Sequence, residues 1–295
     1  MYTSRPAPFT YHRATSVEDA VRLLAELGDA RPLAGGHSLL PAMKLRLSTP
    51  AALVDIGRIA GLDAIEQDGD SVQIGALARH ADVSSSALVQ RQCSALAEAA
   101  GLIGDRQVRN RGTIGGSLAH ADPGADYPAV VRALGATITA VGAGGSREIA
   151  ADDFFVGLFT TALEPGELIT GVRVPAAAPG AGSAYVKHPH PASGYSVAGA
   201  AALVSMEGER CTGARLVIGG VSSTTVDASA ATEDLVGAEP SADAVAAAAE
   251  RVPDLLGGAI GDTYASADYR RHLGAVLARR ALTRAIERAR SPQGA

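Results

Sequence analysis

Two short stretches of the sequence carry a glycine pair beside small hydroxyl residues: AGGHS at 34–38 and TIGGS at 113–117. Glycine has no Cβ, so it tolerates positive φ and lets a ligand approach the main chain closely. Successive N–H groups in such a turn form a concavity that holds anionic oxygens, and the hydroxyls of Ser38, Thr113 and Ser117 add donors. One stretch could hold a phosphate, and two that converge could hold a pyrophosphate.

A ligand-free tight turn is the commoner reason for a single glycine pair, so that alternative stays open for each stretch. Neither stretch is a known nucleotide fingerprint. The residues GGHSLLPAMK lack the G-x-x-x-x-G-K-[ST] spacing of a Walker motif, and no G-x-G-x-x-G supports a Rossmann dinucleotide site. By themselves, the residues therefore predict at most a pyrophosphate ligand.

The first stretch follows elements that the sequence signals clearly. Ser16, with Glu18 and Asp19 close behind, is typical of a helix start, and Gly28 is a plausible end. A short strand is expected over 30–36, a helix over 38–47 and a continuous apolar strand over 51–56. The order helix, strand, loop, helix, strand predicts a small α/β subdomain that ends near Gly57.

The second stretch lies among further expected elements. Strands are predicted over 71–79 and 166–175, helices over 94–104 and 126–136, and a hairpin over 137–149 around Gly144 and Gly145. A compositional break at 176–182 marks a domain boundary. Beyond it, two strand-rich runs at 182–206 and 211–221 could pair, and helices follow over 241–252 and 269–290. A sheet followed by helices indicates an α+β second domain.

Composition excludes several classes of protein. The net charge of −5 argues against a nucleic-acid partner. Cys93 and Cys211, the two cysteines, are too few for a thiolate-held cluster or zinc site and are expected to be buried, reduced thiols. The N-terminus has no apolar signal region, and no stretch near 20 apolar residues lacks charge, so a cytoplasmic location is expected.

Read with their flanks, AGGHSLLPAMKLRL and RNRGTIGGSLAHADPGADYPAV resemble the paired flavin-binding motifs of one family. That family is the medium, FAD-binding subunit of aerobic carbon monoxide dehydrogenase and of xanthine-dehydrogenase-type molybdenum hydroxylases. FTTALEPGELITGVRVP resembles its closing strand of the FAD domain, KHPHPASGYSVAGAAA its segment beside the isoalloxazine ring, and YRRHLGAVLARRAL its C-terminal helix. The resemblance thus covers nearly the whole chain, in order.

The resemblance implies an α+β protein with FAD as cofactor. It places a two-subdomain α/β FAD-binding domain of the PCMH (vanillyl-alcohol-oxidase) type at 1–176, with subdomains at about 1–57 and 58–176. A smaller α+β domain of the carbon monoxide dehydrogenase type is expected at 183–295. Main-chain amides of the two stretches would hold the FAD pyrophosphate. The implied cofactor-binding residues are Ala34, Gly35, Gly36, His37, Ser38, Thr113, Ile114, Gly115, Gly116, Ser117, Asp126, Lys187 and Tyr195.

Three of these residues carry more specific expectations. Asp126 precedes a predicted helix and could simply cap it, whereas the resemblance also has it accept a hydrogen bond from the FAD sugar or ribityl chain. The resemblance puts Lys187 and Tyr195 near the flavin ring. A lysine at the pyrimidine end would stabilise the negative charge of reduction, and a tyrosine over the ring would control access. No residue is assigned with certainty to catalysis.

Other candidates receive plainer interpretations. His37 is expected to be a hydrogen-bonding loop residue rather than a covalent flavin attachment or a catalytic group. His120 and Asp122 have the spacing of metal ligands, but two ligands do not make a site, so no metal is expected. The basic run Arg106, Arg109 and Arg111 is either a solvated face or attracts the diphosphate or a partner protein.

The function implied by the resemblance is electron transfer within a complex. A large molybdopterin subunit would oxidise the substrate, and a small subunit would pass electrons through two [2Fe–2S] clusters. FAD on this chain would then deliver them to a quinone, a cytochrome, oxygen or NAD. The expected assembly is a heterotrimer, usually doubled. HPHP at 188–191 departs from the more basic stretch of the carbon monoxide enzymes, which leaves the substrate open. The rival interpretations are a free-standing flavin reductase and a non-redox assembly module.

Overall fold

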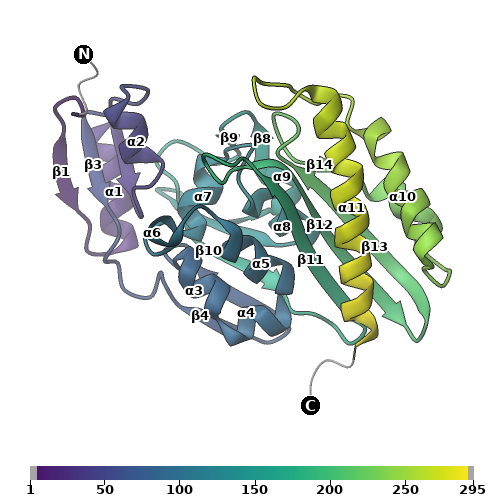
Figure 1. The fold of residues 1–295 in the computed structure, drawn as a ribbon. Helices are drawn as coiled ribbons and strands as arrows, with labels where there is room; N and C mark the ends of the chain where they lie inside the picture. The colour runs from purple at the N-terminus through teal and green to yellow at the C-terminus, as the bar shows by residue number, and fades with distance from the viewer. Residues whose placement is uncertain (1–4, 292–295) are drawn as a thin grey trace.

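The N-terminal unit is a three-stranded parallel sheet with one helix packed on it (Figure 1). The computed structural model describes residues 5–291, and its first sheet has the order β1-β3-β2. Ser16 caps α1 by accepting a hydrogen bond from the Asp19 amide at 3.1 Å, and Gly28 ends the helix at φ 66°. These features were predicted, as were β2, α2 and β3. The elements of the unit are β1 (Thr10–Arg13), α1 (Val17–Leu27), β2 (Ala30–Leu33), α2 (Leu39–Lys44) and β3 (Ala52–Asp55).

The second sheet has five antiparallel strands in the order β4-β5-β10-β6-β7. The hairpin of β6 and β7 turns at Gly145, whose φ is 105°, as predicted from the glycine pair. The closing strand β10 lies between β5 and β6, where Val172 pairs with Ile74 on one side and Ile138 on the other. The strands are β4 (Ile65–Asp68), β5 (Ser71–Gly75), β6 (Thr137–Gly142), β7 (Gly145–Ala150) and β10 (Leu168–Pro175).

Short helices and a small hairpin connect these strands. The sequence predicted α5 and α8, whereas α3, α4, α6 and α7 were not expected, because segments of four to seven residues carry little periodicity. The helices are α3 (His80–Ser85), α4 (Ala87–Gln92), α5 (Ser94–Leu102), α6 (Arg106–Arg109), α7 (Ile114–His120), α8 (Tyr127–Ala133) and α9 (Ala151–Phe154). The two-stranded hairpin is β8 (Phe155–Gly157) and β9 (Thr160–Thr161).

The C-terminal unit is a four-stranded antiparallel sheet, covered on its outer face by two helices (Figure 1). The two strand-rich runs pair with each other, as predicted. Alternate residues face opposite ways: Tyr185, Ala201 and Val217 join the core beneath the second sheet, whereas Ala200 and Leu216 pack under the helices. The elements are β11 (Ala181–Pro189), β12 (Ser196–Glu207), β13 (Arg210–Gly219), β14 (Val226–Asp227), the 3₁₀ helix η1 (Ser229–Leu235), α10 (Ala242–Leu255) and α11 (Ala267–Arg290).

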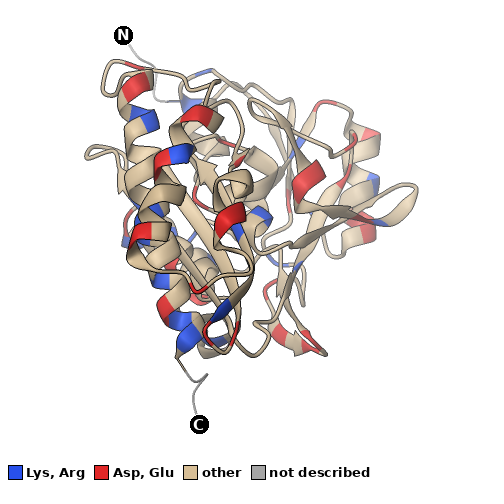
Figure 2. Cartoon of the chain, turned by 90° about the vertical axis from the view of Figure 1, so that its right-hand side faces the viewer, with Lys and Arg blue, Asp and Glu red and all other residues tan. Residues whose placement is uncertain are grey.

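Polar contacts join the two halves of the chain through helix α5. The Ser94 hydroxyl donates to the carbonyl oxygen of Ser183 at 2.8 Å, and Glu98 accepts from the Tyr185 amide at 2.8 Å and from Arg288 at 2.6 Å. Cys93 and Cys211 are both free and buried, as predicted. On the side that carries α10 and α11, positive and negative residues are interspersed (Figure 2). Within residues 5–291, no helix is long and apolar enough to cross a membrane.

Candidate functional site

The first glycine stretch packs against Arg111 and Gly112, the two residues that lead directly into the second stretch. A Cβ on Gly35 would overlap the carbonyl oxygen of Arg111 and would come within 2.8 Å of the Gly112 Cα atom. Gly35 therefore lacks a side chain because the second segment occupies the space beside it. The convergence on which the pyrophosphate interpretation depends is thus present in the fold.

The first stretch leaves its main-chain donors unused. Gly36 has φ 75°, which favours glycine, and the loop turns there from β2 into α2. Within residues 5–291, the four amides from Gly35 to Ser38 donate no hydrogen bond. The exposed His37 ring bonds through Nδ1 to the Gly35 carbonyl oxygen at 3.0 Å, as expected for a loop residue. Four consecutive free amides in a positive-φ turn are suited to an anionic ligand.

The second stretch is built differently, as the first turn of helix α7. Thr113 caps this helix: its Oγ1 accepts from the Gly116 amide at 3.2 Å. The amides of Ile114, Gly115 and Ser117 donate to carbonyl oxygens of the chain, at 2.9–3.0 Å. Neither glycine here has positive φ, so the interpretation of this stretch as a glycine turn is wrong. In the sequence, a capping Thr followed by two glycines in the first turn of a helix resembles the pattern of a tight turn.

The two glycines of α7 have different reasons for lacking a side chain. Gly115 is buried, and a Cβ there would lie 2.6 Å from the Ala76 Cβ atom. Gly116 is exposed, and the one atom within 4 Å of its ideal Cβ is Thr113 Oγ1, at 2.9 Å. Packing therefore explains Gly115, whereas Gly116 leaves open space on the surface of the site.

The buried His80 side chain packs against Gly112, just before the second stretch. It was not among the residues predicted from the sequence. Its Nδ1 lies 3.1 Å from the hydroxyl oxygen of the buried Tyr127, and a Cβ on Gly112 would lie 2.6 Å from its Nε2. Burial lowers the pKa of His80 to about 4, with smaller contributions from His37 and Arg109. A neutral imidazole packed against glycine at the base of a loop holds that loop's backbone in place.

This buried histidine should make the protein acid-sensitive. In the unfolded chain His80 takes up a proton near its ordinary pKa, whereas in the folded chain it stays neutral down to about 4. Stability should therefore fall by roughly 3 kcal/mol as the pH drops through that interval. Urea unfolding followed by circular dichroism, at pH values from about 7 to about 4.5, measures this. His80→Asn should flatten the pH dependence, and the exposed His272→Asn should not; equal slopes in all three proteins would contradict the assignment.

Asp126, Lys187, Tyr185 and Ser196 form a buried polar cluster. The Lys187 ammonium lies 2.9 Å from Asp126 Oδ1, and the two side chains are 2% and 5% exposed. The Tyr185 hydroxyl donates to Asp126 at 2.7 Å, and the Ser196 hydroxyl does so at 3.3 Å. Burial raises the pKa of Asp126, while Lys187 and the two hydroxyls act in the opposite direction.

The capping interpretation of Asp126 is wrong. The residue occupies the N-cap position of α8, but its carboxylate makes no hydrogen bond to that helix. Its partners come instead from β11 and the start of β12, about sixty residues later in the chain. Tyr185 was not singled out in the sequence. Its position two residues before Lys187 on a predicted strand was the available signal, because i and i+2 share a face.

Tyr195 extends from the β11–β12 turn toward the first glycine stretch. Burial raises the pKa of Tyr195, and the nearby Ser38 hydroxyl acts on the phenol in the opposite direction. The side of its ring lies by Gly124, where an added Cβ would be 3.4 Å from Cδ1. The residue is 44% exposed. The fold thus brings Tyr195, Ser38 and the turn before α8 into one neighbourhood.

The remaining candidates have structural partners. The His120 ring packs on Phe159 at 5.2 Å, and Asp122 Oδ1 accepts from the Gly124 amide at 2.9 Å. Arg109 donates to the carbonyl oxygens of Ile103 and Gly104, both at 3.0 Å, at the end of α5. Among residues 5–291, no group of three or more His, Cys, Asp and Glu side chains is placed to hold a metal ion.

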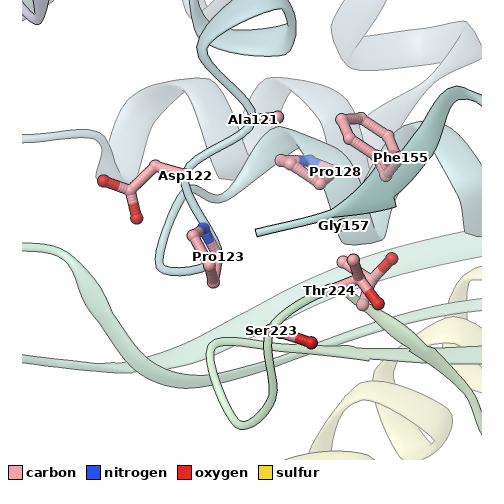
Figure 3. Close-up of a pocket in the computed structure, with 9 residues that line it drawn as sticks. Ala121, Asp122, Pro123, Pro128, Phe155, Gly157, Ser223 and Thr224 are labelled. Carbon is pink, nitrogen blue, oxygen red and sulfur yellow. The ribbon is translucent and has the colours of Figure 1, made fainter. Parts of the chain in front are cut away.

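The exposed residues Arg106 and Arg111 keep free guanidinium groups within the described part of the chain. A small cavity of about 10 Å³, enough for one water, lies between Pro123, Phe155 and Thr224 (Figure 3). The Asp122 carboxylate turns away from the other labelled side chains there. A larger cavity of about 380 Å³ lies near Ser94, Ser183 and Arg288. Neither of these two cavities is lined by a residue of the two glycine stretches.

Comparison with known proteins shows the family to which the chain belongs. The family model described as "FAD binding domain in molybdopterin dehydrogenase" matches residues 7–177, and "CO dehydrogenase flavoprotein C-terminal domain" matches residues 183–285. The chain is 41% identical to the carbon monoxide dehydrogenase medium chain of Afipia carboxidovorans, with 97% of this chain and 99% of the relative covered. The chain belongs to the FAD-binding medium-subunit family of molybdenum hydroxylases.

Solved structures of this family share the fold of the present medium subunit. The carbon monoxide dehydrogenase of Hydrogenophaga pseudoflava matches with a TM-score of 0.92 and 43% identity, over 96% of this chain and 99% of the other. Quinoline 2-oxidoreductase of Pseudomonas putida matches with a TM-score of 0.90 and 33% identity, over 97% of this chain and 100% of the other. These findings confirm the predicted family, fold class and cofactor: the medium subunit is an FAD-binding component of an oxidoreductase.

Proposed function

We propose that this medium subunit receives electrons from a partner subunit that holds two [2Fe–2S] clusters and passes them through FAD to an external acceptor. The observation that carries the proposal is the set of four free amides at Gly35–Ser38, packed against Arg111 and Gly112, which lead into the helix turn where Gly116 has an open face. Both features suit a ligand with an anionic, extended group such as a diphosphate. FAD supplies chemistry that no protein side chain offers, since it accepts and donates one or two electrons.

Each part of the site has a proposed task. The amides of the first stretch donate to the pyrophosphate, and the second stretch contributes the hydroxyls of Thr113 and Ser117 beside the open surface at Gly116. This differs from the expectation that both stretches act alike, because all four amides from Ile114 to Ser117 are engaged within the chain. Tyr195 covers the neighbourhood of the ring and limits access to it, consistent with its place beside Ser38.

The division into domains is also a proposal. We place the FAD-binding domain at 1–176, with subdomains at about 1–57 and 58–176, and the second domain at 183–295. The parallel sheet that ends at Asp55 and the start of β11 at Ala181 support these limits. The FAD site then lies where the two subdomains meet, because Gly35 belongs to one and Arg111 to the other.

The partners are proposed to be a small [2Fe–2S] subunit and a large molybdopterin subunit, in a heterotrimer that dimerises. Cys93 and Cys211 are buried in separate cores, so this chain cannot supply the four thiolates that a cluster needs. The relatives differ in what their names say they act on: carbon monoxide, 6-hydroxypseudooxynicotine or quinoline. Substrate choice is therefore proposed to reside on another subunit.

Purification from the native host tests this function. We expect a complex whose native mass spectrum contains this chain, an iron–sulfur subunit and a molybdopterin subunit. The isolated chain, saturated with FAD, should show flavin absorbance but oxidise no hydroxylase substrate, since electrons reach its site only through a neighbour. A lone chain that turns over with flavin alone would replace the proposal with a free-standing reductase. A complex without flavin would indicate an assembly module.

A further inference from the structure

Lys187 is one of two lysines in the chain and is placed unlike the other. Lys44 lies exposed at the end of α2, whereas the Lys187 side chain is 2% exposed. The ammonium group of Lys187 donates to Asp126 Oδ2 at 3.0 Å and to the Gly194 carbonyl oxygen at 2.8 Å. Its charge is balanced within the protein, and its donors point at one carboxylate and one main-chain carbonyl.

The carboxylate at the centre of the cluster is itself held in place. Asp126 accepts from the hydroxyls of Tyr185 and Ser196, which lie 3.0 Å from each other. These two residues sit on neighbouring strands of the C-terminal sheet. Asp126 is therefore anchored to a rigid sheet, and Lys187 extends this anchored network to the turn at Gly194.

The turn that receives the Lys187 bond is the one that carries Tyr195. It is closed by two main-chain hydrogen bonds, from the His190 amide to Tyr195 at 2.7 Å and from the Gly194 amide to His190 at 2.8 Å. The Ser196 amide ties its end to the Gly124 carbonyl oxygen at 2.9 Å. Within residues 5–291, the Lys187 ammonium is the one side-chain donor from outside the turn that bonds to the turn's main chain. The residues within the turn are exposed or half-exposed, and the His190 ring packs on Tyr264 with the ring centroids 4.5 Å apart.

We propose that Lys187 is a positioning residue: its buried ammonium, anchored by Asp126, fixes the turn that holds Tyr195 beside the first glycine stretch. In this assignment Lys187 acts on the site through Gly194 and Tyr195 rather than as a free charge. The placement of Tyr195 follows from the contacts alone. Its consequence, that Lys187 sets how the flavin site is covered, rests on the function proposed above.

A tryptophan reporter can measure the position of the turn, because the chain contains no Trp. Tyr195→Trp places the sole indole on the turn of the full-length chain. Adding Lys187→Met should lower the steady-state anisotropy of this indole and raise its acrylamide quenching constant by at least about twofold, as for a freed loop. The matched control adds Lys44→Met to the same background and should change neither quantity. Far-ultraviolet circular dichroism checks that each variant is folded.

A second variant covers the case in which Lys187→Met fails to fold. Asp126→Asn with Lys187→Met leaves no buried charge but still lacks the donor to Gly194, so its indole should also be mobile. An indole as immobile as in the Tyr195→Trp parent, in either folded variant, would overturn the proposal and leave Lys187 with a purely stabilising role. These measurements use the flavin-free chain. Repeating them with added FAD separates the two proposals: a turn that is mobile in the Lys187→Met variant supports the positioning role, whereas a Tyr195→Trp parent and a wild-type chain that both bind no FAD contradict the flavin site.

Discussion

Gly116→Val is expected to give a folded chain that does not retain FAD. Gly116 is exposed in the first turn of α7, and its ideal Cβ meets one atom, the Thr113 oxygen that caps the helix. A branched side chain would stand where we propose that the diphosphate approaches, and it would also displace the Thr113 hydroxyl. The lost cap should cost about 1 kcal/mol of stability, which a domain of this size tolerates. The affinity for FAD should fall at least tenfold, or about 1.4 kcal/mol.

Flavin absorbance of the desalted protein and a titration of the stripped chain with FAD measure this loss. The matched control is Gly101→Val, near the end of α5, where the added Cβ would meet only Ser84 at 3.8 Å. That variant should bind FAD normally. Gly35 and Gly36 are poor test positions, because a Cβ at Gly35 collides with Arg111 and Gly36 has positive φ. Stoichiometric FAD on purified Gly116→Val would show that the second stretch is not part of the site.

The largest effect on stability is expected from Lys187→Met. The substitution removes the partner of Asp126 and leaves a carboxylate buried at 5% exposure. An uncompensated buried charge of this kind typically destabilises a protein by about 3–5 kcal/mol. Without the ammonium, the pKa of Asp126, which burial already raises, should rise further. In the variant, ionising Asp126 at higher pH then costs the folded state free energy. The loss of stability relative to the parent should therefore grow as the pH rises and shrink in acid.

The interaction energy between Asp126 and Lys187 is measured by urea unfolding of four proteins. These are the parent, each single variant, and Asp126→Asn with Lys187→Met. The double variant should recover most of the loss, because it buries no unpaired charge. Lys44→Met, at an exposed position, should stay within about 0.5 kcal/mol of the parent. Additive losses in the cycle would mean that the two groups do not act as a pair.

Local signals in the sequence predicted much of the fold. The α1 cap at Ser16, its end at Gly28 and the hairpin at Gly145 are each specified by residues within a few positions of one another. Such features are decided by backbone geometry and nearby hydrogen bonds, which the order of residue types reveals. Strand β1 was missed because its residues, TYHR, are exposed or half-exposed and show no alternation; only its pairing with β3 makes it a strand.

The candidate site also has a part that the sequence predicted and a part that it could not. The types and spacing of residues at 34–38 predicted one binding loop, and the resemblance named the cofactor. Sequence could not reveal that the similar stretch at 113–117 is the capped start of a helix, because two glycines fit a turn and a closely packed helix equally well. The structure shows the Thr113 cap and explains Gly115 by packing, because Ala76 leaves no space for a Cβ there.

By itself, the sequence determined the family, the cofactor, the α+β class and the two glycine stretches, since each depends on residue types in a fixed order along the chain. Only the tertiary structure decided which partners Asp126 and Lys187 have. As the residue before a helix, Asp126 fitted a cap, yet its carboxylate instead pairs with a lysine 61 positions later. The physical reason is desolvation: once the C-terminal sheet covers Asp126, a buried carboxylate needs a cation and hydroxyl donors, and Lys187, Tyr185 and Ser196 are the groups that the sheet brings within reach.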